Sequence, residues 1–191
     1  MADVYSVVIV EDDLDFTFLI QQCIQKCEYL AFAGAAKRGE EGVFLSQKLK
    51  PHVVLMDINL PGGMDGIAAA RAIRLTTKAK VLMLTSCEEP DLIIRASKQS
   101  FASGYIFKSQ CQALVDVVCR TAEGTTPQAL FIREMVMSTL SPAERSIVDM
   151  LIKDDDAPHS AEKTIANQKT SIFRKLGLSS TAELLHVFQH W

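Results

Sequence analysis

The sequence lacks several features that mark specialised classes of protein. None of its five cysteines lies in a C-x-x-C pair, so a zinc ribbon or a thioredoxin-like redox site is not indicated. The odd number of cysteines fits a reducing compartment better than a disulfide scaffold. No apolar run is long enough to cross a bilayer, and no basic segment followed by an apolar run suggests a signal peptide. We therefore expect a cytoplasmic protein without a membrane partner.

The chain also carries little net charge. Its 20 Lys and Arg against 23 Asp and Glu give −3 at pH 7, so overall charge does not favour a nucleic-acid partner, although a local basic face is compatible with it. Hydrophobic residues, by contrast, make up 48% of the 191 residues, which is enough to bury a core. The length suits one domain of ordinary size and a smaller second one.

Residues 4–122 alternate short apolar runs with amphipathic stretches. Continuous apolar runs of this length are typical of strands buried on both faces of a parallel sheet, and the stretches between them show helical spacing. Five strands alternating with five helices predict an α/β fold with an open, doubly wound parallel sheet. The expected strands are Val7–Val10, Leu30–Ala35, Val53–Met56, Val81–Leu84 and Gly104–Phe107. Four of the five helices are expected around 16–27, 65–74, 91–100 and 111–122.

The pattern loosens after residue 122. Residues 123–127 have the composition of a linker, and one helix is expected over residues 129–137, so we assign residues 123–139 as the linker. A small all-α module is predicted over residues 140–191. Its first helix has Ser141 as N-cap and Pro142 at the first helical position, with Glu144 completing a capping box.

Three aspartates and Pro158 are expected to end that first helix of the module. Two further helices are expected at about 161–176 and 180–191, separated by Gly177 as a C-cap. About fifty residues form only a thin core, so we expect the module to lean on the first domain or on a second subunit. The last helix has an apolar face suited to core packing or to a dimer contact, formed by Leu184, Leu185, Val187, Phe188 and Trp191.

Polar residues stand at the ends of the expected strands. Glu11 and Asp12 follow the first strand and Asp57 ends the third, while Thr85 and Lys108 end the fourth and fifth. The carboxyl ends of strands form the ligand crevice of a doubly wound sheet, so these side chains can converge. Crowded carboxylates repel one another, and Mg²⁺, which prefers oxygen ligands, resolves the repulsion. Asp57 can then attack phosphorus, with Lys108 and Thr85 bonded to the resulting acyl phosphate.

Each of these residues alone also has a plainer interpretation. An Asp at a strand end is commonly a turn residue or a helix cap, and the acidic run 11–13 can simply cap the first helix. Thr85 can be a strand-end hydroxyl, and Lys108 a solvated charge. The combination of all of them favours a site that accepts a phosphoryl group.

Residues 4–122 resemble the receiver domain of the response regulators of two-component systems, which has a flavodoxin-like fold. The resemblance rests on the segments Val7–Asp13, Val53–Pro61, Val81–Ser86 and Gly104–Lys108. It implies a receiver over residues 1–122. One departure is the loop Pro61–Gly66, which is one residue longer than the commonest form.

The resemblance also implies roles for individual residues. Asp57 would be the phosphoacceptor, Lys108 would pair with the phosphoryl group, and a histidine kinase would be its donor. Thr85 and Tyr105 would form the switch pair, with Thr85 moving towards the phosphoryl group and Tyr105 turning inward behind it. Mg²⁺ would be held by Glu11, Asp12, Asp57 and the main-chain carbonyl of Asn59. Apart from this phosphotransfer to itself and slow dephosphorylation we expect no enzymatic activity.

Enzymes of the haloacid-dehalogenase class also use an Asp nucleophile at a strand end, in an Asp-x-Asp pattern. Here Asp57 is followed by Ile58 and Asn59, so the second acid, which would protonate a leaving group, is missing. The sequence therefore favours a switch over a turnover phosphatase.

Residues 140–191 resemble the helix-turn-helix output of the NarL/FixJ (LuxR-type) family. The resemblance rests on Leu140–Arg145, Glu162–Ile165 and Ile172–Leu178. In that family the helix corresponding to residues 162–176 enters the major groove, which makes promoter DNA an expected partner. Basic side chains suit the phosphates, and Asn and Gln suit base edges. The candidate DNA contacts are Lys163, Thr164, Asn167, Gln168, Lys169 and Arg174.

The module departs from that family in three ways. Residues 154–160 are too few for its scaffold helix, and its usual Val-Lys-x-His has Ala166 for the Lys and Gln168 for the His. Residues 140–191 also hold 6 basic against 7 acidic residues, a net −1 that is poor for a DNA binder. The alternative is a response regulator with degenerate DNA binding that signals by protein–protein contact. Because receivers of the family often pair through helices, we expect a phosphorylation-sensitive homodimer.

Overall fold

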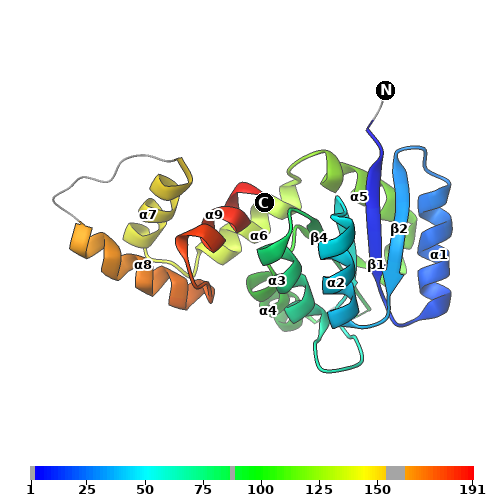
Figure 1. Ribbon diagram of the computed structural model, residues 1–191, viewed down its shortest axis with the longest axis horizontal. Coiled ribbons are helices and arrows are strands. Elements are labelled where there is room, and N and C mark those ends of the chain that lie inside the picture. The colour runs from blue at the N-terminus through cyan, green and yellow to red at the C-terminus, as the bar shows by residue number, and fades with distance from the viewer. Residues whose placement is uncertain (1–2, 87–88, 154–161) are drawn as a thin grey trace.

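A computed structural model describes residues 3–86, 89–153 and 162–191 of the chain. Five parallel strands form one sheet in the order β2-β1-β3-β4-β5, which confirms the predicted doubly wound sheet (Figure 1). The central strands read as apolar runs because both of their faces are covered, and every residue of β3 is buried. The strands are β1 Tyr5–Val10, β2 Leu30–Ala36, β3 Val53–Asp57, β4 Lys80–Thr85 and β5 Gly104–Phe107.

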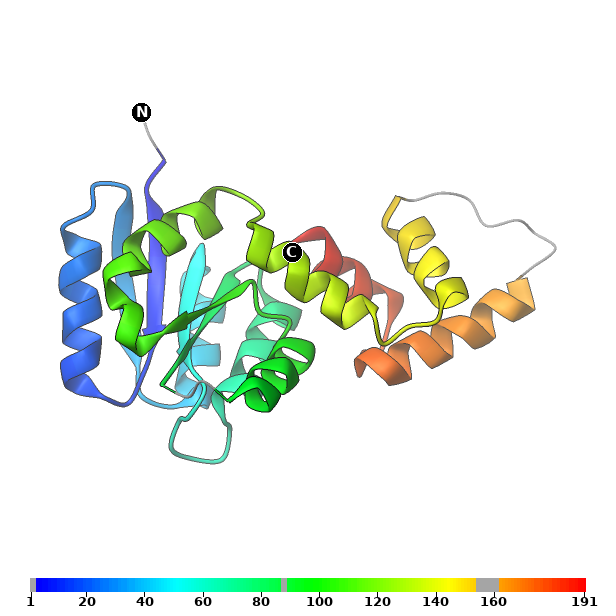
Figure 2. The same ribbon diagram turned by 180° about the vertical axis from the view of Figure 1, so that it is seen from behind.

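Helices cover both faces of this sheet (Figures 1 and 2). On one face α1 and α5 pack on Val7 and Ile9 of β1, and on the other α2, α3 and α4 pack on Val8 and Val10. The alternation of buried residues along β1 thus divides the core into two layers. The helices are α1 Leu14–Gln25, α2 Gly39–Leu49, α3 Gly66–Thr76, α4 Pro90–Ser100 and α5 Leu114–Glu123.

The segment after β5 differs from the prediction of one helix over residues 111–122. A 3₁₀ helix, η1, spans Lys108–Ala113, and α5 starts only at Leu114. Gln110 has φ −108° and ψ 29°, which lie outside the helical region and separate the two turns. The chain therefore turns tightly directly after β5, at the lysine that faces the carboxyl end of the sheet.

In the described ranges after α5 the helices are α6 Pro127–Met137, α7 Pro142–Lys153, α8 Glu162–Leu176 and α9 Thr181–Gln189. The predicted capping box is confirmed, since the Ser141 amide donates to Glu144 Oε2 at 2.7 Å and the Glu144 amide donates to Ser141 Oγ at 3.3 Å. Gly177 ends α8 with φ +64°, as expected of a C-cap. The expected break at Pro158 and the missing scaffold helix fall outside the described residues.

The helical region shares a hydrophobic core with the sheet domain. Trp191, only 7% exposed, packs edge-on against Phe101 at the end of α4, with ring centroids 6.0 Å apart. Its indole nitrogen donates to the Ala129 carbonyl of α6 at 2.8 Å. The expectation that the helices lean on the first domain is confirmed, and the apolar face of α9 serves core packing in this chain.

Helix α6 also covers part of the outer edge of the sheet. The side chain of Gln128 accepts from the Tyr105 amide of β5 at 3.2 Å and donates to its carbonyl at 3.5 Å. One side-chain amide thus takes the place that a neighbouring strand would have. Gly104 leaves room for it, because a Cβ there would lie 2.5 Å from Gln128 Oε1.

Candidate functional site

Three carboxylates and one lysine meet at the carboxyl end of the sheet. Lys108 Nζ lies 2.7 Å from Glu11 Oε2 and 3.1 Å from Asp57 Oδ2. Glu11 and Asp57 are buried, whereas Asp12 beside them is exposed. Carboxylate oxygens of these three acids lie within 4.8 Å of one another. The structure therefore brings together four of the residues that the sequence predicts for the site.

The backbone around these residues explains how neighbouring acids divide their tasks. Asp13 caps α1, since its carboxylate accepts from the amides of Asp15 and Phe16, so the plainer interpretation holds for this member of the acidic run. Glu11 points into the pocket instead and accepts weakly from the Asp13 amide at 3.3 Å. Asp57 accepts from the Asn59 amide, also at 3.3 Å. The backbone of Asn59 thus lies directly beside the pocket.

The charges in the pocket influence one another's ionisation. Burial raises the pKa of Glu11, and the hydrogen bond from Lys108 only partly opposes this. Burial lowers the pKa of Lys108, but its bonds to Glu11 and Asp57 outweigh burial, and the net shift is upward. Lys108 is therefore a permanent cation at neutral pH, held between two buried acids.

This set of donors fits a hard divalent cation. All three acids offer oxygen ligands, which Mg²⁺ prefers, and three carboxylates face a single lysine. The pocket thus retains negative charge that a divalent cation would neutralise. An acidic triad of this kind is typical of the Mg²⁺ site of receiver domains.

The two residues expected to act as a switch lie on neighbouring strands, Thr85 on β4 and Tyr105 on β5. Thr85 ends β4, is fully buried and pairs in register with Phe107 of β5. The hydroxyl oxygen of Tyr105 is also closed off from solvent, and burial raises the pKa of this hydroxyl. Tyr105 contacts the cores of both the sheet domain and the helical region. Its ring therefore joins the two parts of the chain.

The candidate DNA contacts lie on α8. Asn167 and Arg174 are exposed and seven positions apart, so they share one face of the helix, while Gln168 and Lys169 are half-buried. The side chains of Lys163 and Thr164 lie outside the described residues. The first turns of α8 are far from the sheet domain, and only its last turn approaches it (Figures 1 and 2). Arg174 borders a crevice that residues of α3 and α4 also line, so the receiver approaches the C-terminal end of this face.

Three residues at the junction were not anticipated. Arg71 and Arg74 of α3 hydrogen-bond to carbonyls of the helical region, and Gln128 pairs with β5. The sequence pattern does carry a signal for Arg74, because this residue falls on the buried face of α3, where a cation needs hydrogen-bond partners. The carbonyls that serve as partners lie more than 100 residues away, and no sequence pattern indicates them.

Comparison with known proteins decides the family. The family described as "Response regulator receiver domain" matches residues 7–118 of this chain. The chain belongs to the response regulators. This membership makes it a regulator of the two-component type, as expected, and not a turnover enzyme.

Relatives of this response regulator extend over most of its length. It is 30% identical over 199 residues to the response regulator GacA of Pseudomonas syringae pv. syringae, covering 93% of this chain and 92% of GacA. It is 27% identical over 175 residues to the response regulator protein VraR of Staphylococcus aureus, covering 82% and 83%. These full-length relatives are regulators of the NarL/FixJ (LuxR) type, which confirms the resemblance of the module.

Solved structures agree with the fold. A two-component response regulator of the LuxR family from Aurantimonas sp. SI85-9A1 matches with a TM-score of 0.61 and 25% identity, covering 71% of this chain and 97% of its own. The response regulator RcsB in a complex with DNA matches with a TM-score of 0.60, covering 98% and 99%. Its identity of 21% shows a shared fold and no more. In the described ranges of the response regulator, no helix is long and apolar enough to span a membrane.

Proposed function

We propose that this chain is a phosphorylation-dependent switch that receives a phosphoryl group on Asp57 from a histidine kinase. The observation that carries the proposal is the arrangement of Asp57, Glu11 and Lys108, with one buried carboxylate facing a fixed cation and a second acid. In domain terms, we assign residues 1–122 as the receiver, 123–139 as the linker and 140–191 as the output module.

The residues of the pocket can carry out the transfer themselves. A carboxylate oxygen of Asp57 attacks phosphorus, and the bond from phosphorus to the donor imidazole nitrogen breaks, so that an acyl phosphate forms on Asp57. Lys108 already sits between the two acids and needs only to turn its ammonium group to the new phosphoryl oxygens. Thr85, at the end of the adjacent strand, would donate its hydroxyl, and Tyr105 would follow inward behind it.

Mg²⁺ would be held by the carboxylates of Glu11, Asp12 and Asp57 and by the main-chain carbonyl of Asn59. When bound, it supplies the positive charge that offsets the phosphoryl oxygens and the crowded acids. Glu11 and Asp12 would thus act as ligands, and Asp57 would combine the roles of ligand and nucleophile.

Labelling of the full chain with acetyl phosphate in the presence of Mg²⁺ tests the receiver. We expect one phosphoryl group by intact mass in the wild type and none in Asp57→Asn. Asp91→Asn, an exposed acid at the start of α4, is the matched control and should be labelled normally. Labelling of Asp57→Asn, or full labelling after chelation of the metal, would contradict the assignment.

For the output module we propose regulation of transcription through α8. The exposed positions of Asn167 and Arg174 on one face of this helix support it. One observation favours the alternative of signalling by protein contact. Lys175 Nζ lies 2.6 Å from Glu144 Oε2, so its positive charge is already paired with a carboxylate and attracts DNA phosphates less strongly. Together with the net −1 of the module, this leaves few free cations.

Gel shifts with promoter DNA at several salt concentrations distinguish regulation through DNA binding from signalling by protein contact. Regulation through DNA predicts sequence-preferring binding that persists at physiological salt and is weakened in Asn167→Ala and Arg174→Ala. Ser146→Ala, on the neighbouring α7, serves as the control. Binding without sequence preference, or none, would favour protein contact. Sedimentation with and without acetyl phosphate tests the proposed phosphorylation-sensitive homodimer.

A further inference from the structure

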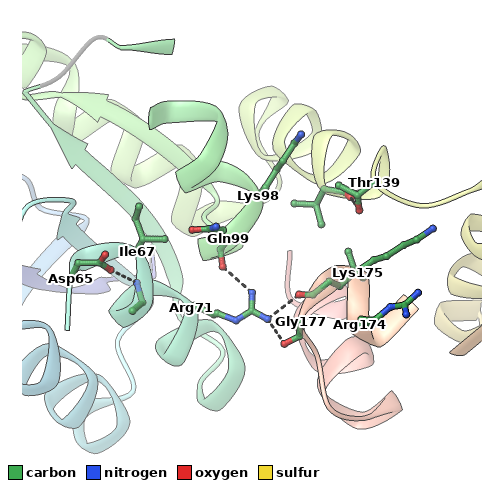
Figure 3. Close-up of a pocket in the computed structure, with 12 residues that line it drawn as sticks. Asp65, Ile67, Arg71, Lys98, Gln99, Thr139, Arg174, Lys175 and Gly177 are labelled. Carbon is green, nitrogen blue, oxygen red and sulfur yellow. Dashed lines mark hydrogen bonds between the residues drawn. The ribbon is translucent and has the colours of Figure 1, made fainter. Parts of the chain in front are cut away.

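Two arginines of α3 hold the ends of two output helices. Arg71 donates from Nη2 to the carbonyls of Leu176, at 2.9 Å, and of Gly177, where α8 ends. Its other terminal nitrogen donates to the Gln99 carbonyl of α4 at 2.9 Å. Figure 3 shows the guanidinium group of Arg71 lying between these carbonyls. One side chain thus bridges α3, α4 and the end of α8.

Arg74, one turn further along α3, does the same for α9. It donates to the carbonyls of Val187 at 3.1 Å and His190 at 2.8 Å, and to the receiver carbonyl of Phe101 at 3.0 Å. The carbonyl ends of α8 and α9 carry the negative ends of the helix dipoles, which suit a cation. We call the contacts of Arg71 and Arg74 with α8 and α9 the arginine clasp.

The charge of Arg74 depends on these carbonyls. The residue is 1% exposed, and within the described ranges no carboxylate pairs with it. Burial lowers its pKa to about 10, so it remains charged at neutral pH. A buried cation needs such partners, so the carbonyls of α9 help to satisfy the guanidinium group of Arg74 where water is excluded.

The opposite end of α3 abuts the phosphorylation site. Gly66, its first residue, donates to the Ile58 carbonyl at 3.1 Å. A Cβ at Gly66 would lie 1.7 Å from the main-chain oxygen of Asp57, so the helix starts in direct contact with the backbone of the acceptor residue. From there, 11 residues at 1.5 Å each span about 16 Å, and this one rigid helix connects Asp57 with both arginines.

We propose that α3 transmits the state of Asp57 to the output helices, with Arg71 and Arg74 as the positioning residues that fix α8 and α9 on the receiver. The coupling rests on the proposed phosphorylation of Asp57. Helices in switching proteins move as units by about 1–2 Å. Such a shift exceeds what hydrogen bonds of about 3 Å tolerate, so a movement of α3 rearranges the clasp.

The two halves of the clasp differ in access. Arg71 is half-buried and borders a crevice of about 580 Å³ between α3, α4, α6 and the end of α8, whereas Arg74 is sealed in the core. We therefore expect opening of the interface to start at Arg71, on the side of α8, while Arg74 retains α9.

The chain contains its own reporter for this interface. Trp191 is the only tryptophan, and it is buried against Phe101, Phe188 and Arg74. Its emission and the small-angle scattering of the full chain can be recorded with and without acetyl phosphate and Mg²⁺. The variants are Arg71→Ala and Arg74→Lys, which keeps the charge but not the forked geometry. Arg95→Ala, at an exposed arginine of α4, is the control.

We expect both clasp variants to scatter as a more extended particle than the wild type, and Arg74→Lys to show red-shifted emission. Acetyl phosphate should change the emission of the wild type and of Arg95→Ala. The two clasp variants should lose at least half of this change although intact mass shows equal phosphorylation. Asp57→Asn should show no change. Scattering and phosphate response equal to the wild type in both clasp variants would overturn the proposal.

Two further outcomes are informative. If Arg74→Lys does not fold, as judged by far-UV circular dichroism, the half-exposed Arg71→Ala decides the question. If the wild type is not phosphorylated at all, the proposed function fails, yet the scattering of the unphosphorylated variants still tests the clasp. A more extended Arg71→Ala then supports it, and an unchanged one refutes it.

Discussion

Replacing Glu144 by Gln should destabilise the protein in a way that depends on pH. Glu144 lies in the first turn of α7, is buried, and accepts from Lys175 of α8 at 2.6 Å and from the Ser141 amide at 2.7 Å. The hydrogen bonds from Lys175 and from the Ser141 amide are the main causes that hold the pKa of Glu144 at about 2, below its ordinary value of 4.5. The Gln side chain keeps the shape and loses the charge.

The size of the effect follows from the shift in pKa. About 1.4 kcal/mol per pKa unit makes the ionised form worth about 3.5 kcal/mol at most, and we expect a loss of about 2–3 kcal/mol at pH 7 because Lys175 is partly exposed. Because the pKa is lowered in the folded state, this stability is fully present above about pH 4.5. It is lost as the pH falls towards 2, so the difference between wild type and Glu144→Gln should shrink over that interval.

Urea unfolding of both chains at pH 7 and at steps down to pH 3, followed by circular dichroism, measures this difference. Glu134→Gln is the matched control, because Glu134 also pairs with a basic residue, Arg145, but is largely exposed. Exposed pairs contribute about 0–1 kcal/mol, so the control should stay close to the wild type. A loss in Glu144→Gln that is the same at every pH, or no greater than in the control, would refute the reasoning.

Two other substitutions test the site. Gly66→Ala should lower the thermal midpoint and abolish labelling by acetyl phosphate, because its Cβ would lie 1.7 Å from the Asp57 carbonyl oxygen; Gly124→Ala, with open space around it, should do neither. Lys108→Met should destabilise the metal-free protein, since carboxylate oxygens within 4.8 Å of one another repel by at least about 3 kcal/mol at an effective dielectric constant of about 20. Mg²⁺ should therefore raise its thermal midpoint more than that of the wild type, and an equal rise in both would show that Lys108 does not balance Glu11.

The sheet was predictable because its signals are local. Runs such as Val53–Met56 are apolar on both faces, and that pattern has few alternatives in an alternating chain. The convergence of Glu11, Asp57 and Lys108 followed from topology, since all parallel strands end at one edge. The capping box at Ser141 was equally local, because it involves residues three positions apart.

What could not be predicted depends on contacts between distant segments. The sequence indicated a linker over residues 123–139, but not that α6 would pack on β5 and accept the Trp191 indole. The partners of Arg74 are main-chain carbonyls, which every residue has, so no side-chain pattern identifies them. The start of α5 was misplaced for a different reason: the kink at Gln110 interrupts a run that is helical in composition.

The pairing of Gln128 with β5 has a consequence for solubility. β5 is the last strand of the sheet, and an uncovered edge strand is a template for pairing with another chain. The side-chain amide of Gln128 occupies the amide and carbonyl of Tyr105 and so blocks that edge at its centre. A fragment that stops before α6 would expose the unpaired edge of β5. Aggregation of such a fragment would reflect the loss of the Gln128 side chain that covers this edge.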